Sequence, residues 1–242
     1  MSDKKPDLAF VVPAYNVEAY LAETIVSCLT QSHKNIEIIV VDDGSTDATP
    51  DIIKFYKDRD PRVKGLRVPN GGRGAARNIG CQAADAPLLA MLDADDRSDK
   101  GRARATIDLH AENPMAYLYG GASLISVFGA ELAHFIPEAL VIEKVLASPR
   151  KENGIVHSTA AFPRDLWGQF KFDEDEYQAI GLDDWHQQTR MALAGVKFVY
   201  TPKILSGYTQ VATGISRTRD ERQVLAMKEK FLSGVGAYAQ VA

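Results

Sequence analysis

The 242-residue sequence has few cysteines, no long apolar run and no large excess of one charge. Its two cysteines, Cys28 and Cys81, are too few for a disulfide framework and are typical of a reducing compartment. No segment reaches the roughly 18 apolar residues that a membrane-spanning helix needs. The apolar run near the N-terminus stops at Pro13, too soon for a signal peptide. We therefore expect a soluble, cytoplasmic protein, and peripheral contact with the inner face of a membrane stays open.

The charge balance also excludes one class of partner. With 28 basic and 32 acidic residues, the net charge is −4, so no overall positive field attracts nucleic acid. A hydrophobic share of 45% and a charged share of 25% are ordinary for a globular protein of this size. We find no internal repeat, low-complexity segment or linker. One domain with two lobes is therefore expected rather than two independent domains.

The first hundred residues alternate between strand-like and helix-like patterns. Short apolar, β-branched runs, typical of buried strands, occupy residues 8–12, 36–41, 63–68 and 87–92. Apolar residues at helical spacing lie between these runs and predict three helices. Asn16 is expected to cap the first helix, and Pro50 is expected to lie in the first turn of the second. A glycine-rich turn is expected to precede the third. This order predicts βαβ units and an α/β fold with a mostly parallel sheet.

The second half is less regular. We expect helices at about 98–112, 138–147 and 219–233, and another within 181–195 that Gly195 closes. Strands are expected near 115–119, 122–128, 155–162 and 196–201.

Ligands of such sheets bind beyond the carboxyl ends of the strands, and polar motifs lie at those ends here. The fourth run leads directly into three acids, Asp93, Asp95 and Asp96. Like charges this close repel, more strongly where water is scarce. Either the acids form a solvated turn or something positive lies among them.

Five motifs occur in register with these strand ends: VVPAYN at 11–16, VDDGSTDAT at 41–49, NGGRGAARNIG at 70–80, LDADD at 92–96 and LDDW at 182–185. Together they resemble the family 2 glycosyltransferases over about residues 7–216. The resemblance implies the GT-A fold, in which helices flank a Rossmann-like, mostly parallel central sheet beside a smaller acceptor-side lobe. It implies one domain over 1–242, with a nucleotide-sugar-binding half at 7–112, an acceptor and catalytic half at 113–216 and a C-terminal helix at 217–242.

The same resemblance implies an activity. We expect an inverting transfer of a sugar from a nucleotide-diphosphate sugar, with UDP favoured, to a hydroxyl of a glycan or lipid-linked glycan, in surface polysaccharide or lipopolysaccharide synthesis. It implies Mn²⁺ or Mg²⁺ bound by Asp95, while Asp93 reaches the metal or the ribose and Asp96 is a further candidate. A hard cation takes oxygen ligands and offsets the charge of the departing diphosphate.

By resemblance, the other donor-binding residues are Pro13, Tyr15, Asp43, Arg77 and Asn78. Pro13 would fix a turn and Tyr15 would lie over a base ring. Asp43 would accept a hydrogen bond from the base or ribose. Simpler interpretations stay open: Tyr15 packs on the surface, and Asp43 forms an Asx turn or helix cap. Arg73 is interpreted as solvated.

On the acceptor side, the acidic pair followed by tryptophan is Asp183, Asp184 and Trp185. The resemblance implies that Asp184 is the general base, which takes the proton of the attacking hydroxyl. Asp183, Trp185 and His157 are expected to contact substrate. The alternatives are that the two acids favour the N-terminus of a helix, and that Trp185 and His157 pack in the core.

Two departures from the family pattern bear on activity. Many relatives carry Tyr-Arg-x-His after the last strand, but this chain has Tyr208-Thr209-Gln210-Val211, without the histidine. Lys100 and Gly101 stand where a Pro-Asp pair is common. The alternative function is therefore a catalytically impaired module that binds a nucleotide sugar or a glycan. The sequence leaves the donor sugar, the acceptor, the linkage and the oligomeric state open.

Overall fold

The computed structural model describes residues 5–136, 154–210 and 220–234. Its strands are β1 (Leu8–Ala14), β2 (Ile36–Asp42), β3 (Val63–Arg67), β4 (Leu88–Met91), β5 (Arg97–Ser98), β6 (Tyr117–Ile125), β7 (Glu131–Phe135), β8 (Ala161–Pro163) and β9 (Phe198–Thr209). Its helices are α1 (Leu21–Leu29), α2 (Thr49–Lys57), α3 (Arg73–Ala83), α4 (Arg102–Glu112), α6 (Arg164–Gln169), α7 (Glu176–Ala179), α8 (Asp183–Leu193) and α10 (Glu221–Gly234), with a short 3₁₀ turn, η1 (His157–Thr159).

All nine described strands form one sheet, in the order β3-β2-β1-β4-β8-β6-β9-β5, with β7 paired to β6. The four strands of the first half are parallel, as predicted, and so is the long pairing of β6 with β9. The remaining pairings, β4 with β8, β8 with β6, β5 with β9 and β6 with β7, are antiparallel. The sheet therefore runs unbroken across the boundary expected between the two halves.

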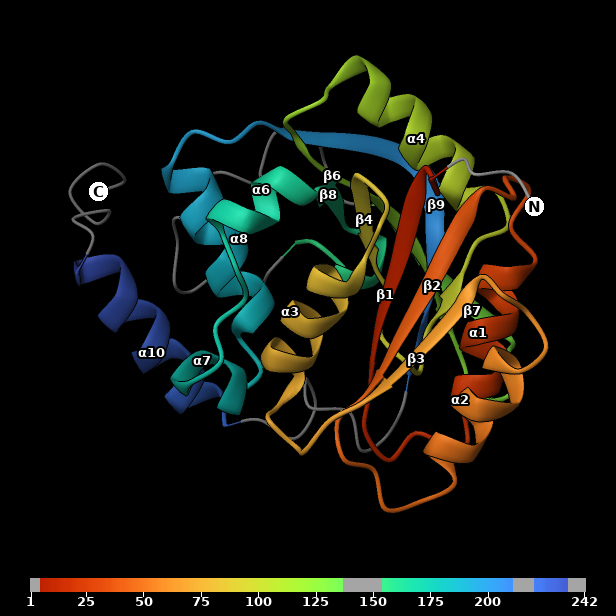
Figure 1. Cartoon of the computed structure of the whole chain (residues 1–242). Coiled ribbons are helices and arrows are strands. Elements are labelled where there is room, and N and C mark those ends of the chain that lie inside the picture. Colours follow the sequence, from red (N-terminus) through yellow and green to blue (C-terminus); the bar gives the residue numbers. More distant parts are fainter. Residues whose placement is uncertain (1–4, 137–153, 211–219, 235–242) are drawn as a thin grey trace.

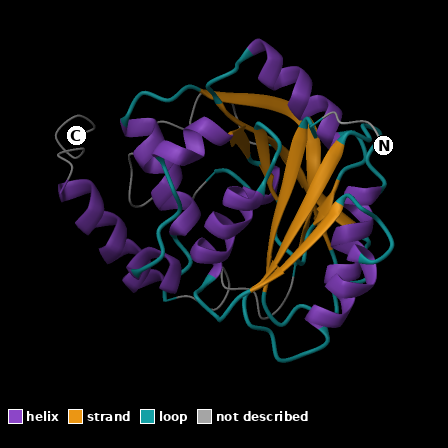
Figure 2. Ribbon diagram, in the orientation of Figure 1, coloured by secondary structure: helices purple, strands orange, loops and turns teal. Residues whose placement is uncertain are grey.

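Helices cover both faces of this sheet (Figures 1 and 2). Successive side chains of a strand point to opposite faces, so β1 contributes to two cores. Phe10 and Val12 pack in a cluster with residues of α1 and α2, whereas Ala9 and Val11 pack in a cluster with residues of α3 and α8. These strands read as unbroken apolar runs because both of their faces are buried.

The structure corrects several predicted elements. Asn16 does not cap a helix, because α1 begins only at Leu21 and Asn16 itself has a positive φ of 50°. The two strands expected near 115–119 and 122–128 are the single strand β6, and the first part of the 155–162 strand is η1. The sequence analysis missed β5, β7, α6 and α7. The helix expected at 138–147 lies outside the described residues.

The remaining predicted elements are confirmed within a few residues, including the closure of α8 near Gly195, whose φ is +78°, except that β9 continues to Thr209, well beyond the end predicted at residue 201. Within the described ranges, none of the helices combines the length and apolarity that crossing a bilayer requires.

Candidate active site

The predicted site residues gather at the carboxyl edge of the parallel strands. In the sheet register, Ala14 of β1 lies beside Asp42 of β2, and Val11 of β1 lies beside Met91 of β4. The loops that follow these strands therefore leave the sheet at one edge. Pro13 does not form the turn, because it lies inside β1, beyond the last residue that pairs with β4. Its missing N–H interrupts no bond of that ladder.

The loops after β1 and β2 are clasped together by reciprocal bonds to the backbone. The Asn16 amide N–H donates to Ser45 Oγ, and the Thr46 amide donates to Asn16 Oδ1. The Glu18 amide donates to Asp47, and the Ala48 amide donates to Glu18. This clasp fixes the loop that carries Tyr15, whose side chain is half exposed at the same edge.

Asp43 is buried, and its carboxylate binds the glycine-rich turn. Oδ1 accepts from the Gly71 amide at 2.8 Å, and Oδ2 accepts from the Gly72 amide at 2.9 Å. Gln178 of α7 binds a further amide of the first turn, because its Oε1 accepts from Gly74 N at 3.1 Å. The amides of Gly71, Gly72 and Gly74 are thus used within the protein, with each Asp43 oxygen already accepting one bond.

Two arginines of α3, one turn apart, connect the acid-rich loop to helix α8. Arg77 donates from Nη2 to Asp93 Oδ1 at 2.6 Å and from Nη1 to Asp183 Oδ2. Arg73 donates from Nε to Asp183 Oδ1 at 2.6 Å. Burial alone would raise the pKa of the Asp93 and Asp183 carboxyls, but Arg77, together with Arg73 and His157, outweighs it, so both pKa values lie below the usual range. Both acids are therefore ionised and internally paired.

Among the described residues, Asp96 is held by hydrogen bonds and forms no ion pair. Its Oδ1 accepts from the Thr209 amide at 2.8 Å, and its Oδ2 accepts from the Ser158 hydroxyl. The Ser158 oxygen in turn accepts from the Asp93 amide at 3.0 Å. Burial, and then the charges of Asp95 and Asp93, raise the Asp96 pKa well above its usual value. Asp96 thus ties the acidic turn to η1 and to the end of β9.

Asp95 and Asp184 differ from these three acids, since in the described part of the chain neither forms an ion pair, as Asp93 and Asp183 do, or a hydrogen bond to a distant segment, as Asp96 does. Asp95 is half-buried, and burial followed by the charge of Asp93 raises its pKa. Asp184 lies in the first turn of α8, where its Oδ1 accepts from the Trp185 amide at 2.7 Å. These two acids remain available to a ligand, as does the Asp93 oxygen that Arg77 does not bind.

The acidic turn fits a divalent cation only in part. Among the described residues, no group of three His, Cys, Asp or Glu side chains is arranged to hold a metal ion. Asp95 and the second oxygen of Asp93 would supply two carboxylate ligands. Mg²⁺ is commonly held by one or two carboxylates together with substrate phosphates and water, so this donor set fits a metal that arrives with a diphosphate.

The remaining predicted contacts are buried. His157 is 5% exposed and lies edge-on to Phe172, with no partner for either ring nitrogen among the described residues. Burial, and then Arg77, lower its pKa to about 4, so the ring is neutral at pH 7. Trp185 is 1% exposed and packs edge-on against Phe231 of α10. Its burial favours the core-packing interpretation.

Asn78 is engaged entirely within the protein. Its Oδ1 accepts from Trp167 Nε1 and from the Phe172 amide, and its Nδ2 donates to Phe172 O and to Glu174. An amide side chain has two donors and two acceptor positions, and all four are used. The geometry therefore argues against the donor contact expected for Asn78.

Sequence reasoning missed three residues of this network, Arg73, Ser158 and Gln178. Arg73 is not solvated as expected, because it is paired with a fully buried carboxylate. Its i, i+4 spacing from Arg77 could have indicated a shared helix face. Ser158 and Gln178 carry no sequence signal, because their partners depend on how distant segments pack.

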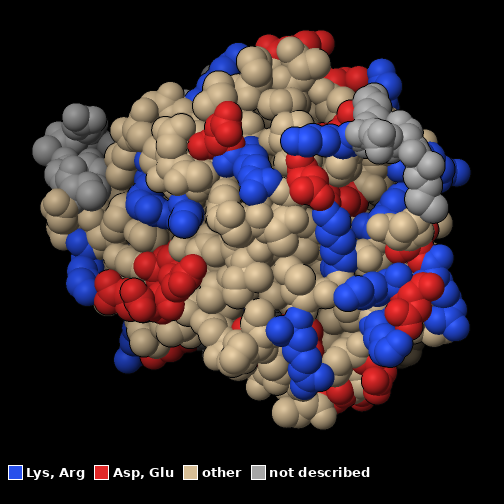
Figure 3. All heavy atoms as spheres, viewed as in Figure 1, with Lys and Arg blue, Asp and Glu red and all other residues tan. Residues whose placement is uncertain are grey.

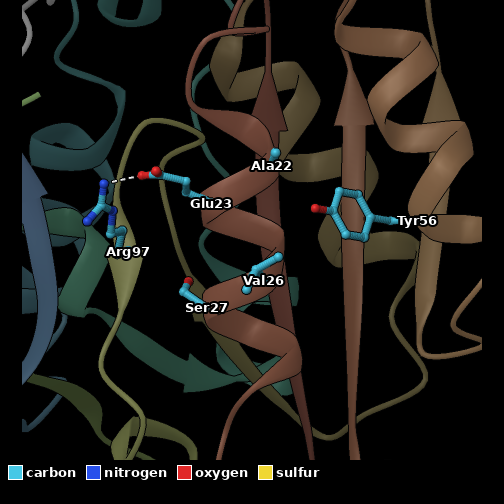
Figure 4. Close-up of a pocket in the computed structure, with 6 residues that line it drawn as sticks. All are labelled: Ala22, Glu23, Val26, Ser27, Tyr56 and Arg97. Atoms are coloured by element: carbon cyan, nitrogen blue, oxygen red, sulfur yellow. Dashed lines mark hydrogen bonds and ion pairs between the residues drawn. The ribbon is translucent and has the colours of Figure 1, made fainter. Parts of the chain in front are cut away.

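A surface hollow of about 360 Å³ lies on the other side of the sheet, between α1, α2 and β5 (Figure 4). The ion pair between Glu23 and Arg97 spans one wall of it. Its lining residues are Ala22, Glu23, Val26, Ser27, Tyr56 and Arg97, none of which is a predicted site residue. It holds no acid cluster like the one at the strand ends.

Sequence comparisons agree with this geometry. A model of the family described as "Glycosyl transferase family 2" matches residues 9–166. The chain is 35% identical to TuaG of Bacillus subtilis, a glycosyltransferase assigned to teichuronic acid biosynthesis, over 71% of the chain and 68% of TuaG. It is 37% identical to an uncharacterised glycosyltransferase of Haemophilus influenzae over 52% of the chain, but spans only 51% of that relative's length.

Solved structures show the same fold at low sequence identity. TarS of S. aureus in complex with UDP-GlcNAc gives a TM-score of 0.68 at 20% identity, covering 92% of this chain and 66% of TarS. A mannosyltransferase of Pyrobaculum calidifontis with GDP-Man and Mn²⁺ gives 0.66 at 21% identity, covering 99% of this chain and 70% of that one. The expected GT-A fold is thereby confirmed. With its motifs, its sheet and the family match over 9–166, the chain belongs to glycosyl transferase family 2.

Proposed function

We propose that this chain is a metal-dependent, inverting glycosyltransferase that uses a nucleotide-diphosphate sugar, with UDP-sugars favoured. One observation carries the proposal. Of the five acids at the candidate site, Asp93 and Asp183 are paired with arginine and Asp96 is bound by Ser158 and the Thr209 amide, whereas Asp95 and Asp184 have no such bond to another segment in the described ranges. They come from separate elements, the turn after β4 and the start of α8, so two roles can be divided between them.

The donor would lie at the carboxyl edge, with its base near Tyr15 and its diphosphate at the turn after β4. Acidic and basic side chains are interspersed over the face in Figure 3, so the diphosphate charge has to be met locally. Asp95, with Asp93, would hold Mn²⁺ or Mg²⁺, which as a Lewis acid stabilises the departing diphosphate. Arg77 would keep Asp93 ionised and oriented for this task.

Asp184 would act as the general base. It would accept the proton of the acceptor hydroxyl as that oxygen attacks the anomeric carbon from the side opposite the diphosphate. The bond between the anomeric carbon and the diphosphate breaks at the same time, and its electron pair leaves with the diphosphate. The neighbouring Asp183 is clamped by Arg73 and Arg77, so the first turn of α8 is fixed and only Asp184 is left free to react. His157, neutral and unpartnered in the described structure, would donate a hydrogen bond to substrate.

The similarity to TuaG, and to the succinoglycan biosynthesis protein ExoO of Rhizobium meliloti (34% identical over 75% of this chain), supports a role in polysaccharide synthesis. The nucleotide sugars bound by TarS and by the mannosyltransferase support a donor of that class. The acceptor would be a hydroxyl of a glycan or a lipid-linked glycan. This chain spans about half to two thirds of these proteins, so their full activities are not transferred to it.

A transfer assay with Asp184→Asn tests the base. We expect the variant to bind UDP with unchanged affinity and to lose about 10²- to 10⁴-fold in turnover, the usual contribution of a general base. Asp165→Asn is the matched control, because Asp165 is an exposed acid in the first turn of another helix, α6. Full turnover in Asp184→Asn would refute the assignment.

The impaired-module alternative has a distinct outcome. The motif position that lacks histidine, Val211, lies outside the described residues. If the wild-type chain binds nucleotide sugars but neither hydrolyses nor transfers any of a panel, the protein is a binding module of the same fold.

A further inference from the structure

Arg73 differs from Arg77 in having its terminal nitrogens partly exposed and unused within the described residues. Arg77 is 2% exposed and bonds two carboxylates with its two terminal nitrogens. Arg73 donates only from Nε, to Asp183, and its side chain is 26% exposed. Its two terminal nitrogens, with four N–H groups, have no hydrogen-bond partner in the described part of the structure.

The anchor fixes the direction of this free group. Asp183 is fully buried, and its two oxygens are bound by two different arginines, so it cannot turn away. Because a guanidinium is planar, a bond at Nε sets the plane in which both Nη groups lie. An arginine side chain loses rotamer entropy when it is immobilised, and here that loss is incurred before any ligand binds.

The neighbours of this group belong to the candidate site. Arg73 is one turn before Arg77 on the same face of α3, which lies beside α8 in Figure 1. Burial would lower the pKa of Arg73, but Asp183 raises it, and Asp184 and Asp93 add to this effect although neither forms an ion pair with Arg73. A fixed, accessible guanidinium edge matches two oxygens of one anionic group, either phosphate or carboxylate.

We propose that Arg73 binds an oxyanion of the donor through its two terminal nitrogens. This inference rests on the proposed function. It adds Arg73 to the donor-binding residues, although the sequence pattern did not predict a role in donor binding for it. Two parts of a donor present the required chemistry: the diphosphate, which every donor has, and a carboxylate on the sugar, which only uronic acid donors have.

Titration calorimetry in the presence of Mn²⁺ separates these sources, with UMP, UDP, UDP-glucose and UDP-glucuronate as probes. Arg73→Gln should lower the affinity for each ligand that Arg73 contacts about ten- to hundredfold, as expected for the loss of a charge-assisted hydrogen bond. If Arg73 binds the β-phosphate, the affinities for UDP and both nucleotide sugars fall while that for UMP does not; if it binds the α-phosphate, the affinities for all four probes fall. If it binds a carboxylate, only UDP-glucuronate weakens.

Two variants guard against a purely structural explanation. Arg73→Lys keeps the charge but loses the planar group, so it should fold and show a smaller loss of affinity; it carries the test if Arg73→Gln fails to fold. Arg104→Gln removes an exposed arginine of α4 that pairs only with Asp108 among the described residues, and it should bind every probe normally.

Unchanged affinities for all four probes in a folded Arg73 variant would overturn the inference and leave the proposed function intact. A fall in melting temperature without any change in affinity would do the same, since it would show that Arg73 only supports Asp183. If the wild-type chain bound none of the four probes and also failed to bind GDP and GDP-mannose, the proposed function would be overturned together with this inference.

Discussion

Five aspartates meet at the candidate site, and their hydrogen-bond partners put them in different states. Asp93 and Asp183 are ionised and paired with arginine, Asp96 is bound to a hydroxyl and a backbone amide, and Asp95 and Asp184 are free of cations within the described structure. The repulsion expected of clustered acids is thus relieved partly by Arg77, which lies between Asp93 and Asp183. A metal ion would have to offset only the remaining negative charge.

The role of Asp96 can be tested through stability. Asp96→Ala would leave the Thr209 amide without its acceptor at a buried position, which costs about 1–3 kcal/mol. Asp96→Asn keeps an oxygen at that place, and Ser158 can rotate to accept from the new amide group. We therefore expect urea denaturation to show a clear loss for alanine and a smaller one for asparagine. Equal losses for both variants would mean that the hydrogen bonds of Asp96 contribute little.

At the scale of elements, helix α3 connects the site. Its first turn is capped by Gln178 of α7, and its two arginines contact the acidic turn and α8. It packs so closely on the neighbouring segment that a Cβ at Gly74 would lie 2.0 Å from the carbonyl oxygen of Asp173. Glycine is required there for close approach of two backbones, although alanine is the better helix former.

Gly74→Ala should therefore destabilise the protein. The gain in helix propensity is about 1 kcal/mol, whereas overpacking against a backbone atom costs about 1–3 kcal/mol and displaces Arg73 and Arg77. Gly168→Ala in α6 is the control, because nothing lies within 4 Å of a Cβ there, and it should stabilise by about 0.4–1 kcal/mol. Thermal unfolding of both variants measures the two effects. A Gly74→Ala protein as stable as Gly168→Ala would show that the segments can move apart.

The first half of the fold was predictable because its strands and motifs carry local signals. The second half was not, and the reasons are particular. Gly120 and Gly121 made β6 look like two strands, yet the strand continues with irregular register against β9, where a Cβ at Gly120 would lie 2.6 Å from Leu205. Asn16 resembled a helix cap, but its side chain bonds the loop after β2.

The site was predictable in its residue types and less so in its connections. The motifs brought Asp93, Asp95 and Asp184 to one edge of the sheet, but nothing in the spacing shows which acid an arginine pairs with. Arg77 and Asp183 are 106 positions apart, and their contact depends on how α3 and α8 pack. The same holds for Asn78, whose four hydrogen bonds all involve residues about 90 positions or more away.

At the scale of the whole molecule, three helices close over the core beside the site. His186 of α8 stacks on Tyr177 of α7 with ring centroids 4.1 Å apart and lies edge-on to Phe231 of α10 at 4.8 Å. Burial, and then the charge of Arg190, lower the pKa of His186 to about 4. Asp173, Glu176 and Asp183 act in the opposite direction but do not outweigh burial.

This neutral histidine predicts acid sensitivity. The unfolded chain binds a proton at His186 below a pKa of about 6.5, whereas the folded protein does so only near 4. Its contribution to stability is therefore present above about pH 6.5 and is lost progressively as the pH falls toward 4. The loss between pH 7 and 5 would be at most about 2 kcal/mol. His186→Gln should unfold in urea with a shallower dependence on pH over this range, and an unchanged dependence would contradict the prediction.

The most direct test of the account is the Mn²⁺ dependence of UDP affinity in Asp95→Asn, measured by titration calorimetry with Mn²⁺ and with EDTA. We predict that the wild-type chain binds UDP at least about tenfold more tightly with Mn²⁺, a difference of about 1.4 kcal/mol, and that Asp95→Asn abolishes this difference. If Asp95→Asn retained the full Mn²⁺ effect, the cation would be bound elsewhere, and the division of roles among the five acids would be wrong.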